Sequence, residues 1–468
     1  MTGQYGLLSP LWAGTAAAAD TSDEAVLLAL LQVEAAWAET LAVAGAVPES
    51  SAAAIRTLWR RQQESSTAPF DAQVLAAAAP GGGNPVIPLV KLMRQTLASE
   101  GCSDSALHRG ATSQDILDTA LRLVIGQVSK DISRHAVRIC DALAALADDH
   151  RHTLCVARSL TQHALPTTFG LRAAGWLDGV QQAIGALHTS LDSMPLQWGG
   201  AVGTRAALVD WQGSEDAHQL ILDLATRLGL PAGRPWHSQR QPALRVASSL
   251  AGVLAALGKL AGDVLLLQRP EIGELRESAA PGRGGSSAMP HKQNPVQSVL
   301  IRSAANAAPN LLATMYAAAS SAQDERPDGA WHAEWPALAE LLRLAAGASQ
   351  RAADLVSGLE TFPEQMQKNL QSAGDVLLSE RLALRLGPLL PGGSKALQTA
   401  VEQSVSSDLP LREILADLLR SAEPTGEREE ALEELDGLLD PAGYLGHAED
   451  LTDSVLADYQ QNRSAWNE

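Results

Sequence analysis

The longest helical pattern in this chain constrains its fold more than any other feature. Between residues 113 and 150, apolar side chains recur at 117, 121, 124, 128, 132, 139, 143 and 146, a spacing of about 3.5 residues. Similar patterns cover residues 166–190, 242–268, 295–322 and 334–358. Five helices of this length cannot bury their apolar faces in one small monomeric core. The sequence therefore predicts a bundle of long helices that neighbouring subunits complete in a homo-oligomer.

Composition and length support an all-α fold with several domains. Aromatic residues make up only 4% of the 468 residues while alanine is abundant, which favours closely packed helices over a β-sandwich. A chain of this length exceeds one ordinary core. We expect three helical domains, over residues 1–107, 108–358 and 359–468. The central domain would hold the long-helix bundle and the catalytic loop.

Local signals predict where several helices begin and end. Ser22 is expected to cap a helix that runs from Thr21 to Gly45, and a second helix is expected after Pro48. Residues 76–88, which contain three glycines and three prolines, predict a loop. Pro242 and Pro295 lie near predicted helix starts, and Pro309 is expected to kink the fourth long helix.

Charge and cysteine content exclude several classes of function. A net charge of −18 argues against non-specific nucleic-acid binding, although a local pocket can still be basic and bind an acidic substrate. Three isolated cysteines give no disulfide framework and no metal-ligand motif, so no metal and no cofactor are expected. The first residues lack a basic signal-peptide region, and no uninterrupted apolar run reaches 18 residues. We expect a cytoplasmic protein without a membrane partner.

Residues 284–296 carry the strongest chemical signal. Two glycines precede Ser286 and Ser287, and Lys292 and Asn294 follow before a predicted helix start at Pro295. Glycines give the loop conformational freedom, and Asn294 is a suitable N-cap. A hydroxyl, a cation and an amide beside a helix N-terminus suit an anion that gains charge during a reaction. The alternative is a Gly/Ser linker that happens to precede a helix.

A second set of polar residues opens the longest helix. Thr112 or Ser113 is a plausible N-cap, and Asp115 or Asp118 suits the positive end of the helix dipole. Backbone N–H groups and hydroxyls at such a position can bind a carboxylate. Plain helix capping is the alternative reading of the same residues.

Both segments resemble signatures of the fumarase/aspartase superfamily. Residues 285–295 match GSSxMPxKxNP, and residues 112–119 match TSxDxxxT. The resemblance implies a fumarase-type helical fold in which Ser286, the first serine of the pair, moves the proton with the help of Lys292. The residues that it implies for substrate binding are His108, Thr112, Ser113, Gln114 and Asn294.

A third segment, residues 158–170, resembles the superfamily pattern R-T-H-x-x-x-A-x-P-T-T-F-G but departs from it. Ser159 and Leu160 stand where fumarases and adenylosuccinate lyases carry Thr-His, and that histidine assists protonation of the leaving group. Ser159 is expected to bind substrate. His163, three residues beyond Leu160, is expected to act in the site by binding a carboxylate; a hydrogen-bonded core histidine is the alternative.

The missing histidine discriminates between reactions. A hydroxide or an amine leaves as a strong base and needs a proton. A carboxylate has a pKa of about 4 and needs none. Leu160 therefore favours a reaction whose nucleophile or leaving group is a carboxylate.

Two further stretches resemble bacterial 3-carboxy-cis,cis-muconate cycloisomerases within the superfamily, GNPVIPLV at residues 83–90 and GAWHAEW at residues 329–335. They add Trp331 and His332 to the expected substrate-binding residues, unless the aromatic run only packs a helix start. The resemblance implies an intramolecular lyase of aromatic catabolism that lactonises a small tricarboxylate. It also implies a homotetramer whose active sites are shared between subunits. The alternatives are a C–N or C–O lyase such as adenylosuccinate lyase, and a non-catalytic helical oligomer.

Overall fold

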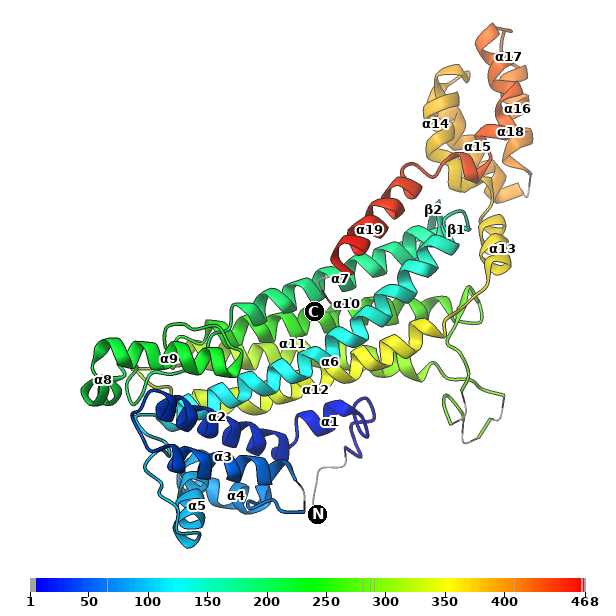
Figure 1. Cartoon of the computed structure of the whole chain (residues 1–468). Coiled ribbons are helices and arrows are strands. Elements are labelled where there is room, and N and C mark those ends of the chain that lie inside the picture. Colours follow the sequence, from blue (N-terminus) through cyan, green and yellow to red (C-terminus); the bar gives the residue numbers. More distant parts are fainter. Residues whose placement is uncertain are drawn as a thin grey trace. The chain divides into compact units, whose positions relative to one another are not determined.

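A computed structural model describes residues 6–64, 66–280, 282–286, 288–289, 291–407, 409–463 and 466. Helices are the main secondary structure of the described residues, which include only four short strands, so the predicted all-α class is confirmed. Five long helices dominate it (Figure 1). They are α6 (Ser113–Asp149), α7 (Phe169–Asp192), α10 (Gln241–Leu267), α11 (Val296–Ser320) and α12 (Gly329–Ser357).

The chain divides into two compact units. Unit 1 contains residues 1–136, 180–261 and 297–354, and unit 2 contains residues 137–179, 262–296 and 355–468. Each unit therefore takes part of the long helices. The predicted domains are consecutive segments with boundaries at residues 107 and 358, whereas the two compact units each combine several segments of the chain. The three-domain arrangement stays a prediction.

Unit 1 combines parts of the long helices with shorter helices from the first half of the chain. Large apolar side chains without solvent exposure, among them Trp37, Met93 and Ile116, form its core. The short elements are α1 (Ala16–Asp20), α2 (Asp23–Val43), α3 (Glu49–Gln63), α4 (Ala72–Ala78), η1 (Ala79–Gly81), α5 (Val86–Ser99), α8 (Ala206–Gln212) and α9 (Ser214–Leu228).

Unit 2 contains the strands and the C-terminal helices. Strands β1 (Leu154–Ser159) and β2 (Gln162–Thr168) pair antiparallel, as do β3 (Leu275–Arg276) and β4 (Glu360–Thr361). A separate leucine-rich core lies among the C-terminal helices, with Leu382, Leu415 and Leu435 fully buried. The remaining elements are α13 (Pro363–Ala373), η2 (Asp375–Leu378), α14 (Ser379–Leu386), η3 (Gly387–Leu389), α15 (Gly393–Ser407), α16 (Leu411–Arg420), α17 (Gly426–Glu433), α18 (Leu435–Leu438), η4 (Pro441–Gly443) and α19 (Ala448–Arg463).

Several predicted helix ends are confirmed. The Ser22 side chain accepts the Ala25 N–H at the start of α2, and Gly45 follows the end of α2 with a positive φ of 74°. Helix α3 starts directly after Pro48, and α6 covers almost the whole of the predicted 113–150 pattern. Helix α11 continues through Pro309, and a kink there stays a prediction.

Three predicted boundaries were wrong. Residues 76–88 are only partly a loop, because the Asp71 side chain caps α4 and the Asn84 side chain accepts the Val86 N–H at the start of α5. The pattern at 166–190 begins as strand, and its helix starts at Phe169. Helix α12 starts at Gly329, five residues before the predicted start.

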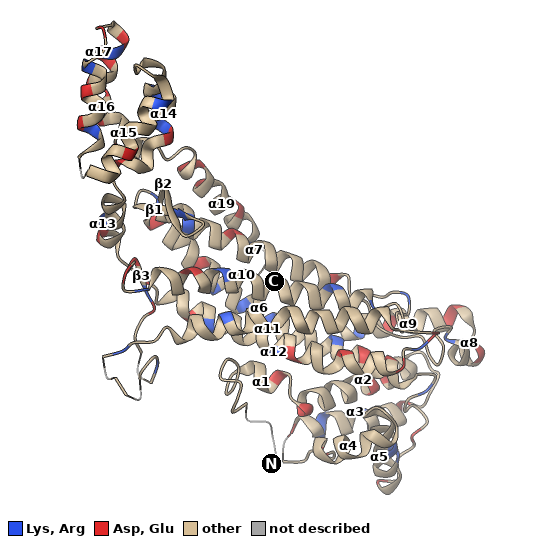
Figure 2. Ribbon diagram, turned by 180° about the vertical axis from the view of Figure 1, so that it is seen from behind, with Lys and Arg blue, Asp and Glu red and all other residues tan. Residues whose placement is uncertain are grey.

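Two helices, α2 and α10, are long and apolar enough to cross a membrane by length and composition alone. Of their most apolar windows, 67% and 44% respectively are buried inside the protein. Core helices of globular proteins share these properties, so this is weak evidence for a span. In the ribbon of Figure 2, positions of Lys and Arg and positions of Asp and Glu both occur along many of the helices.

Candidate active site

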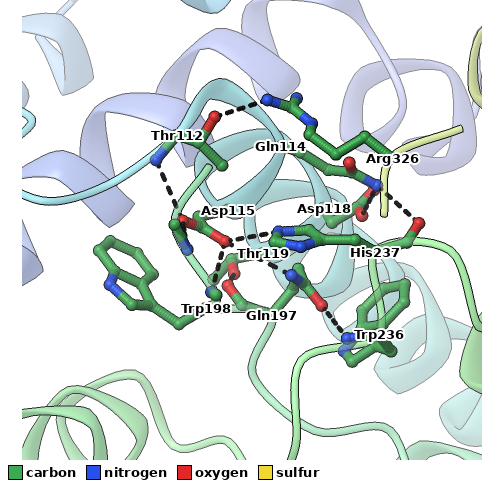
Figure 3. Close-up of polar contacts among 12 residues, drawn as sticks. Thr112, Gln114, Asp115, Asp118, Thr119, Gln197, Trp198, Trp236, His237 and Arg326 are labelled. Carbon is green, nitrogen blue, oxygen red and sulfur yellow. Dashed lines mark hydrogen bonds and ion pairs between the residues drawn. The ribbon is translucent and has the colours of Figure 1, made fainter. Parts of the chain in front are cut away.

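The start of α6 forms the first part of the candidate site, in unit 1. Thr112 occupies the N-cap position: its N–H donates to Asp115 Oδ2 at 3.0 Å, and its carbonyl oxygen accepts the Asp115 N–H. The Asp115 carboxylate thus accepts the N–H of the N-cap residue, as the side chain at the third helical position does in a capping box. The Thr112 hydroxyl accepts a hydrogen bond from Arg326 Nη1 at 2.8 Å (Figure 3). Ser113 follows at the first helical position and is partly exposed.

Asp115 is fully buried and connects three segments of unit 1. Its carboxylate accepts the N–H groups of Gly199 at 2.7 Å and Gly200 at 2.9 Å. It also lies 2.9 Å from Nε2 of His237. These donors compensate the cost of burying the charge. The sequence alone suggested that Asp115 only caps the helix. In the structure it also binds the Gly199–Gly200 backbone and His237.

Asp118, one turn further along α6, belongs to a buried ion cluster. Arg240 donates to Asp118 at 2.7 and 3.1 Å and to Glu334 at 2.7 Å. All three side chains are at least 96% buried. Burial raises the pKa of Glu334 despite the neighbouring Arg240. Burial alone would lower the pKa of Arg240, but its two carboxylate partners raise it above its ordinary value.

Gln114 differs from its predicted role. Its side chain is fully buried, and Nε2 donates to Asp118 Oδ2 at 3.2 Å and to the His237 carbonyl oxygen at 3.0 Å. Both amide hydrogens are therefore used inside unit 1, and only the carbonyl oxygen Oε1 is left without a partner among the described residues. A carbonyl oxygen cannot donate to a carboxylate. The structure gives Gln114 the role of tying α6 to the segment that precedes α10.

His108 lies just before α6 and pairs with a buried glutamate of α2. Its Nδ1 is 2.6 Å from Glu34 Oε1, and its backbone N–H also donates to Glu34. Burial works to lower the pKa of His108, but the Glu34 carboxylate outweighs it and the pKa is raised. His108 therefore has an increased tendency to carry positive charge, four residues before Thr112 in the sequence.

The predicted residues Trp331 and His332 lie in the first turn of α12. Trp331 is 3% exposed and donates through Nε1 to Asp118 at 3.0 Å, which agrees with packing of a helix start. His332 is exposed, and its Nε2 lies 2.7 Å from the Gly83 carbonyl oxygen. The two stretches that resemble the cycloisomerases, around Gly83 and around Trp331, therefore meet through His332.

The loop with the strongest sequence signal lies in unit 2. The Gly284 carbonyl oxygen accepts the backbone N–H of Asn294 at 2.8 Å and its side-chain Nδ2 at 3.2 Å. Asn294 thus closes the loop, and its capping of α11, which starts at Val296, stays a prediction. The φ of Gly284 is +73°, and a Cβ there would lie 2.7 Å from the Asn294 carbonyl oxygen, so this position requires glycine.

Within this loop, Ser286 Oγ accepts the N–H groups of Ala288 at 3.3 Å and Met289 at 3.1 Å. Lys292 is exposed, and its backbone N–H donates to the Met289 carbonyl oxygen. The turn thus fixes Ser286 through its oxygen. Ser287 lies outside the described residues.

Ser159, Leu160 and His163 belong to the hairpin of β1 and β2, which sequence reasoning missed. Leu160 and Thr161 form its two-residue turn with φ of +50° and +69°, as in a type I′ turn. Leu160 is 93% exposed, and Ser159 and His163 are exposed beside it. On the same strand as Ser159, Arg158 donates to the fully buried Glu274 at 2.7 Å.

The structure thus brings the predicted residues together in separate groups. His108, Thr112, Ser113, Gln114 and Trp331 surround the start of α6 in unit 1, with His332 next to Trp331. Ser286, Lys292 and Asn294 share one loop of unit 2, and Ser159 and His163 share its hairpin. Sequence reasoning missed the contacts of Asp115 with Gly199, Gly200 and His237. It also missed Arg240 and Arg326. Among the described residues, no group of three or more His, Cys, Asp or Glu side chains is arranged to hold a metal ion.

Comparisons with known proteins agree with this architecture. The sequence profile of a family described as lyase matches residues 15–309. Nitrosuccinate lyase of Streptomyces davaonensis is 43% identical over 458 residues, which is 96% of this chain and 94% of that protein. The 3-carboxy-cis,cis-muconate cycloisomerase of Pseudomonas aeruginosa is 39% identical over 448 residues, 94% of this chain and 93% of that protein.

Among solved structures, the 3-carboxy-cis,cis-muconate lactonizing enzyme of Pseudomonas putida superposes with a TM-score of 0.85 at 34% identity. The match covers 97% of this chain and 99% of that structure. The family profile, the long alignments and the helical architecture all agree with the signatures of the TSxD and GSS segments. The chain belongs to the lyase family of the fumarase/aspartase superfamily.

Proposed function

We propose that this lyase is a 3-carboxy-cis,cis-muconate cycloisomerase, which adds one carboxylate of a conjugated triacid to a double bond and forms a lactone. The observation that carries the proposal is Leu160 at the hairpin tip. In a chain similar to cycloisomerases over nearly its whole length, the position that supplies a leaving-group acid in other lyases holds an apolar residue. A carboxylate is already ionised at neutral pH and gains nothing from such an acid.

Nitrosuccinate cleavage is the second candidate, favoured by the 43% identity to nitrosuccinate lyase. Elimination of nitrite from nitrosuccinate breaks a C–N bond and releases an anion that is a weak base, like a carboxylate. Leu160 is therefore compatible with both reactions, and the resemblance of residues 83–90 and 329–335 to the cycloisomerases is what favours the first. It disfavours adenylosuccinate cleavage, in which an amine has to leave.

In the proposed lactonisation, Ser286 delivers a proton to the carbanion that develops next to a carboxylate. Water has a pKa of about 15.7, and holding a similar hydroxyl as an alkoxide at pH 7 requires a shift of roughly 8 units, or about 11 kcal/mol. A helix dipole supplies at most ~2 kcal/mol. A neutral serine needs no such shift before it donates, and solvent water then returns a proton to its oxygen. The two N–H groups that bind Ser286 Oγ occupy the oxygen and leave its proton for transfer.

Cationic and neutral donors are proposed to bind the substrate carboxylates. Lys292 is exposed in the loop of Ser286, and the Thr112 hydroxyl and Arg326 lie together at the N-terminus of α6. Such donors stabilise an anion whose charge increases in the transition state. In the described part of the chain Arg326 makes no ion pair with a carboxylate, so its charge is free to serve a substrate. His163 and Ser159 are proposed to contact substrate from the hairpin.

A two-substrate assay tests the proposal. Purified protein is mixed with 3-carboxy-cis,cis-muconate and, separately, with nitrosuccinate, and adenylosuccinate serves as the control. Loss of the diene absorbance in the ultraviolet supports the cycloisomerase, and colorimetric release of nitrite supports the second candidate. Robust cleavage of adenylosuccinate would overturn both, together with the argument from Leu160.

We also propose a homotetramer in which active sites are shared between subunits. Val299 and Tyr316 on α11 are 51% and 52% exposed although they belong to a long apolar helix, which suits a covered interface. Mixing an inactive His163→Ala chain with an inactive Ser286→Ala chain tests the sharing. Recovered activity in verified mixed oligomers supports it, and its absence there contradicts it.

A further inference from the structure

His237 is the least explained polar side chain near the start of α6. It lies four residues before α10 and is 3% exposed. Its Nε2 is 2.9 Å from Asp115 Oδ1 (Figure 3). A carboxylate oxygen only accepts hydrogen bonds, so the proton between the two atoms belongs to Nε2 of the histidine. The other ring nitrogen, Nδ1, is buried and has no hydrogen-bond partner among the described residues.

The ring is held tightly by the chain that follows Trp198. A Cβ added to Gly199 would lie 2.6 Å from Cε1 of His237, and one added to Gly203 would lie 3.8 Å from Nδ1. Gly199 therefore has to be glycine for the ring to keep its place. Gly200 and Gly203 have positive φ angles of 69° and 83°, so this loop adopts a backbone that few sequences allow.

Asp115, the partner of His237, accepts hydrogen bonds from two separate segments of the chain. The N–H groups of Gly199 and Gly200 both end on its carboxylate, and so does the N–H of Thr112. Each of these bonds needs the carboxylate in one rotamer. A donor that fixes this rotamer therefore fixes both the loop over residues 199–204 and the backbone around the Thr112 hydroxyl.

We propose that His237 is a positioning residue that acts through Asp115. Nε2–H locks the Asp115 carboxylate, and Asp115 then holds Thr112 and the Gly199–Gly200 backbone in the geometry that receives a substrate carboxylate. The inference rests on the proposed function for the role of Thr112. The Nδ1 atom has no part in this proposal, because none of the described residues forms a hydrogen bond with it.

The two ring nitrogens are distinguished by isosteric replacement. His237→Gln places an amide N–H near the position of Nε2, whereas His237→Asn places it near Nδ1 and leaves Asp115 without this donor. We expect His237→Gln to stay within about threefold of the wild-type kcat/KM. We expect His237→Asn to lose on the order of tenfold to 100-fold, mainly through a higher KM, as for a lost hydrogen bond to a charged group. His218→Asn, on the exposed face of α9, is the matched control.

Hydrogen exchange supplies a readout that does not depend on the substrate. Amides of Gly199 and Gly200 are expected to exchange at least about tenfold faster in His237→Asn and at the wild-type rate in His237→Gln and His218→Asn. If wild type converts neither proposed substrate, the proposed function fails while exchange still decides the role of His237. Equal exchange in His237→Asn and wild type, or equal losses in the Gln and Asn variants, would overturn the inference.

Discussion

Replacing Arg240 by methionine is the sharpest perturbation of the candidate site. Arg240 is 97% buried and donates to both oxygens of Asp118 and both oxygens of Glu334, at distances between 2.7 and 3.1 Å. Methionine keeps most of the volume and removes the only cation of the cluster. Two buried carboxylates then face each other without a counter-charge.

The expected cost follows from that geometry. Breaking one buried ion pair costs about 3–5 kcal/mol in free energy of unfolding, because the remaining charge stays desolvated. Arg240 serves two carboxylates, so we expect the upper part of this range for Arg240→Met. Arg240→Lys keeps the charge but loses the planar fork and should cost less. The double variant Arg240→Met/Glu334→Met removes one stranded carboxylate and should recover about half of the loss.

Urea unfolding followed by circular dichroism at fixed protein concentration measures these differences. The pH adds an independent check. The pKa of Glu334 is already raised by burial and rises further without Arg240. A group whose folded-state pKa exceeds its unfolded value favours folding at low pH, so Arg240→Met should regain stability as the pH falls from 7 towards 5. A loss below about 1 kcal/mol at pH 7, or a double variant no more stable than the single one, would refute the reasoning.

Three further predictions concern backbone strain and charge. Leu160→Asn/Thr161→Gly should slow hydrogen exchange of the hairpin amides by about tenfold, because Asn-Gly suits a type I′ turn; faster exchange would contradict the turn assignment. Gly284→Ala should lower kcat/KM by more than about tenfold while the melting temperature changes little, since a Cβ there forces the serine loop open. The stability difference between wild type and His108→Gln should be full below pH 6.5 and shrink as the pH rises through the raised pKa of His108, and a constant difference would exclude the Glu34 pair as its source.

The long helices could be predicted because their signal is local and repeated. In α6 the apolar spacing holds from residue 117 to residue 146, about eight turns, and a capping residue precedes the helix. The hairpin of β1 and β2 could not, because its turn is Leu160-Thr161 rather than a sequence that favours positive φ. Nothing in a leucine followed by a threonine predicts that both adopt left-handed backbone.

The candidate site was predictable only where a segment carries its own motif. Thr112 and Ser286 stand in recognisable sequence motifs, and the structure places Thr112 at a helix start and Ser286 in a turn, where the hydroxyl oxygen of each accepts a hydrogen bond. Arg326 meets Thr112 across 214 positions, and His237 meets Asp115 across 122. Contacts between residues so far apart in the sequence produce no repeating pattern that a single sequence could show. Gln114 shows the reverse case, since its motif suggested a substrate contact and the fold turned its amide inward.

Leu160→His tests whether the chemistry of the leaving group, rather than the stability of the fold, explains why residue 160 is a leucine. Leu160 is 93% exposed, so a histidine there meets no steric barrier and should leave stability nearly unchanged. It restores the residue that fumarases and adenylosuccinate lyases use to protonate a leaving group. Since carboxylate and nitrite depart or attack already ionised, the added acid should raise neither lactonisation nor nitrite release. Leu160→Asn controls for polarity at the tip. A clear rate increase in Leu160→His alone would show that this reaction does need an acid there, and the argument from the leaving group would fail.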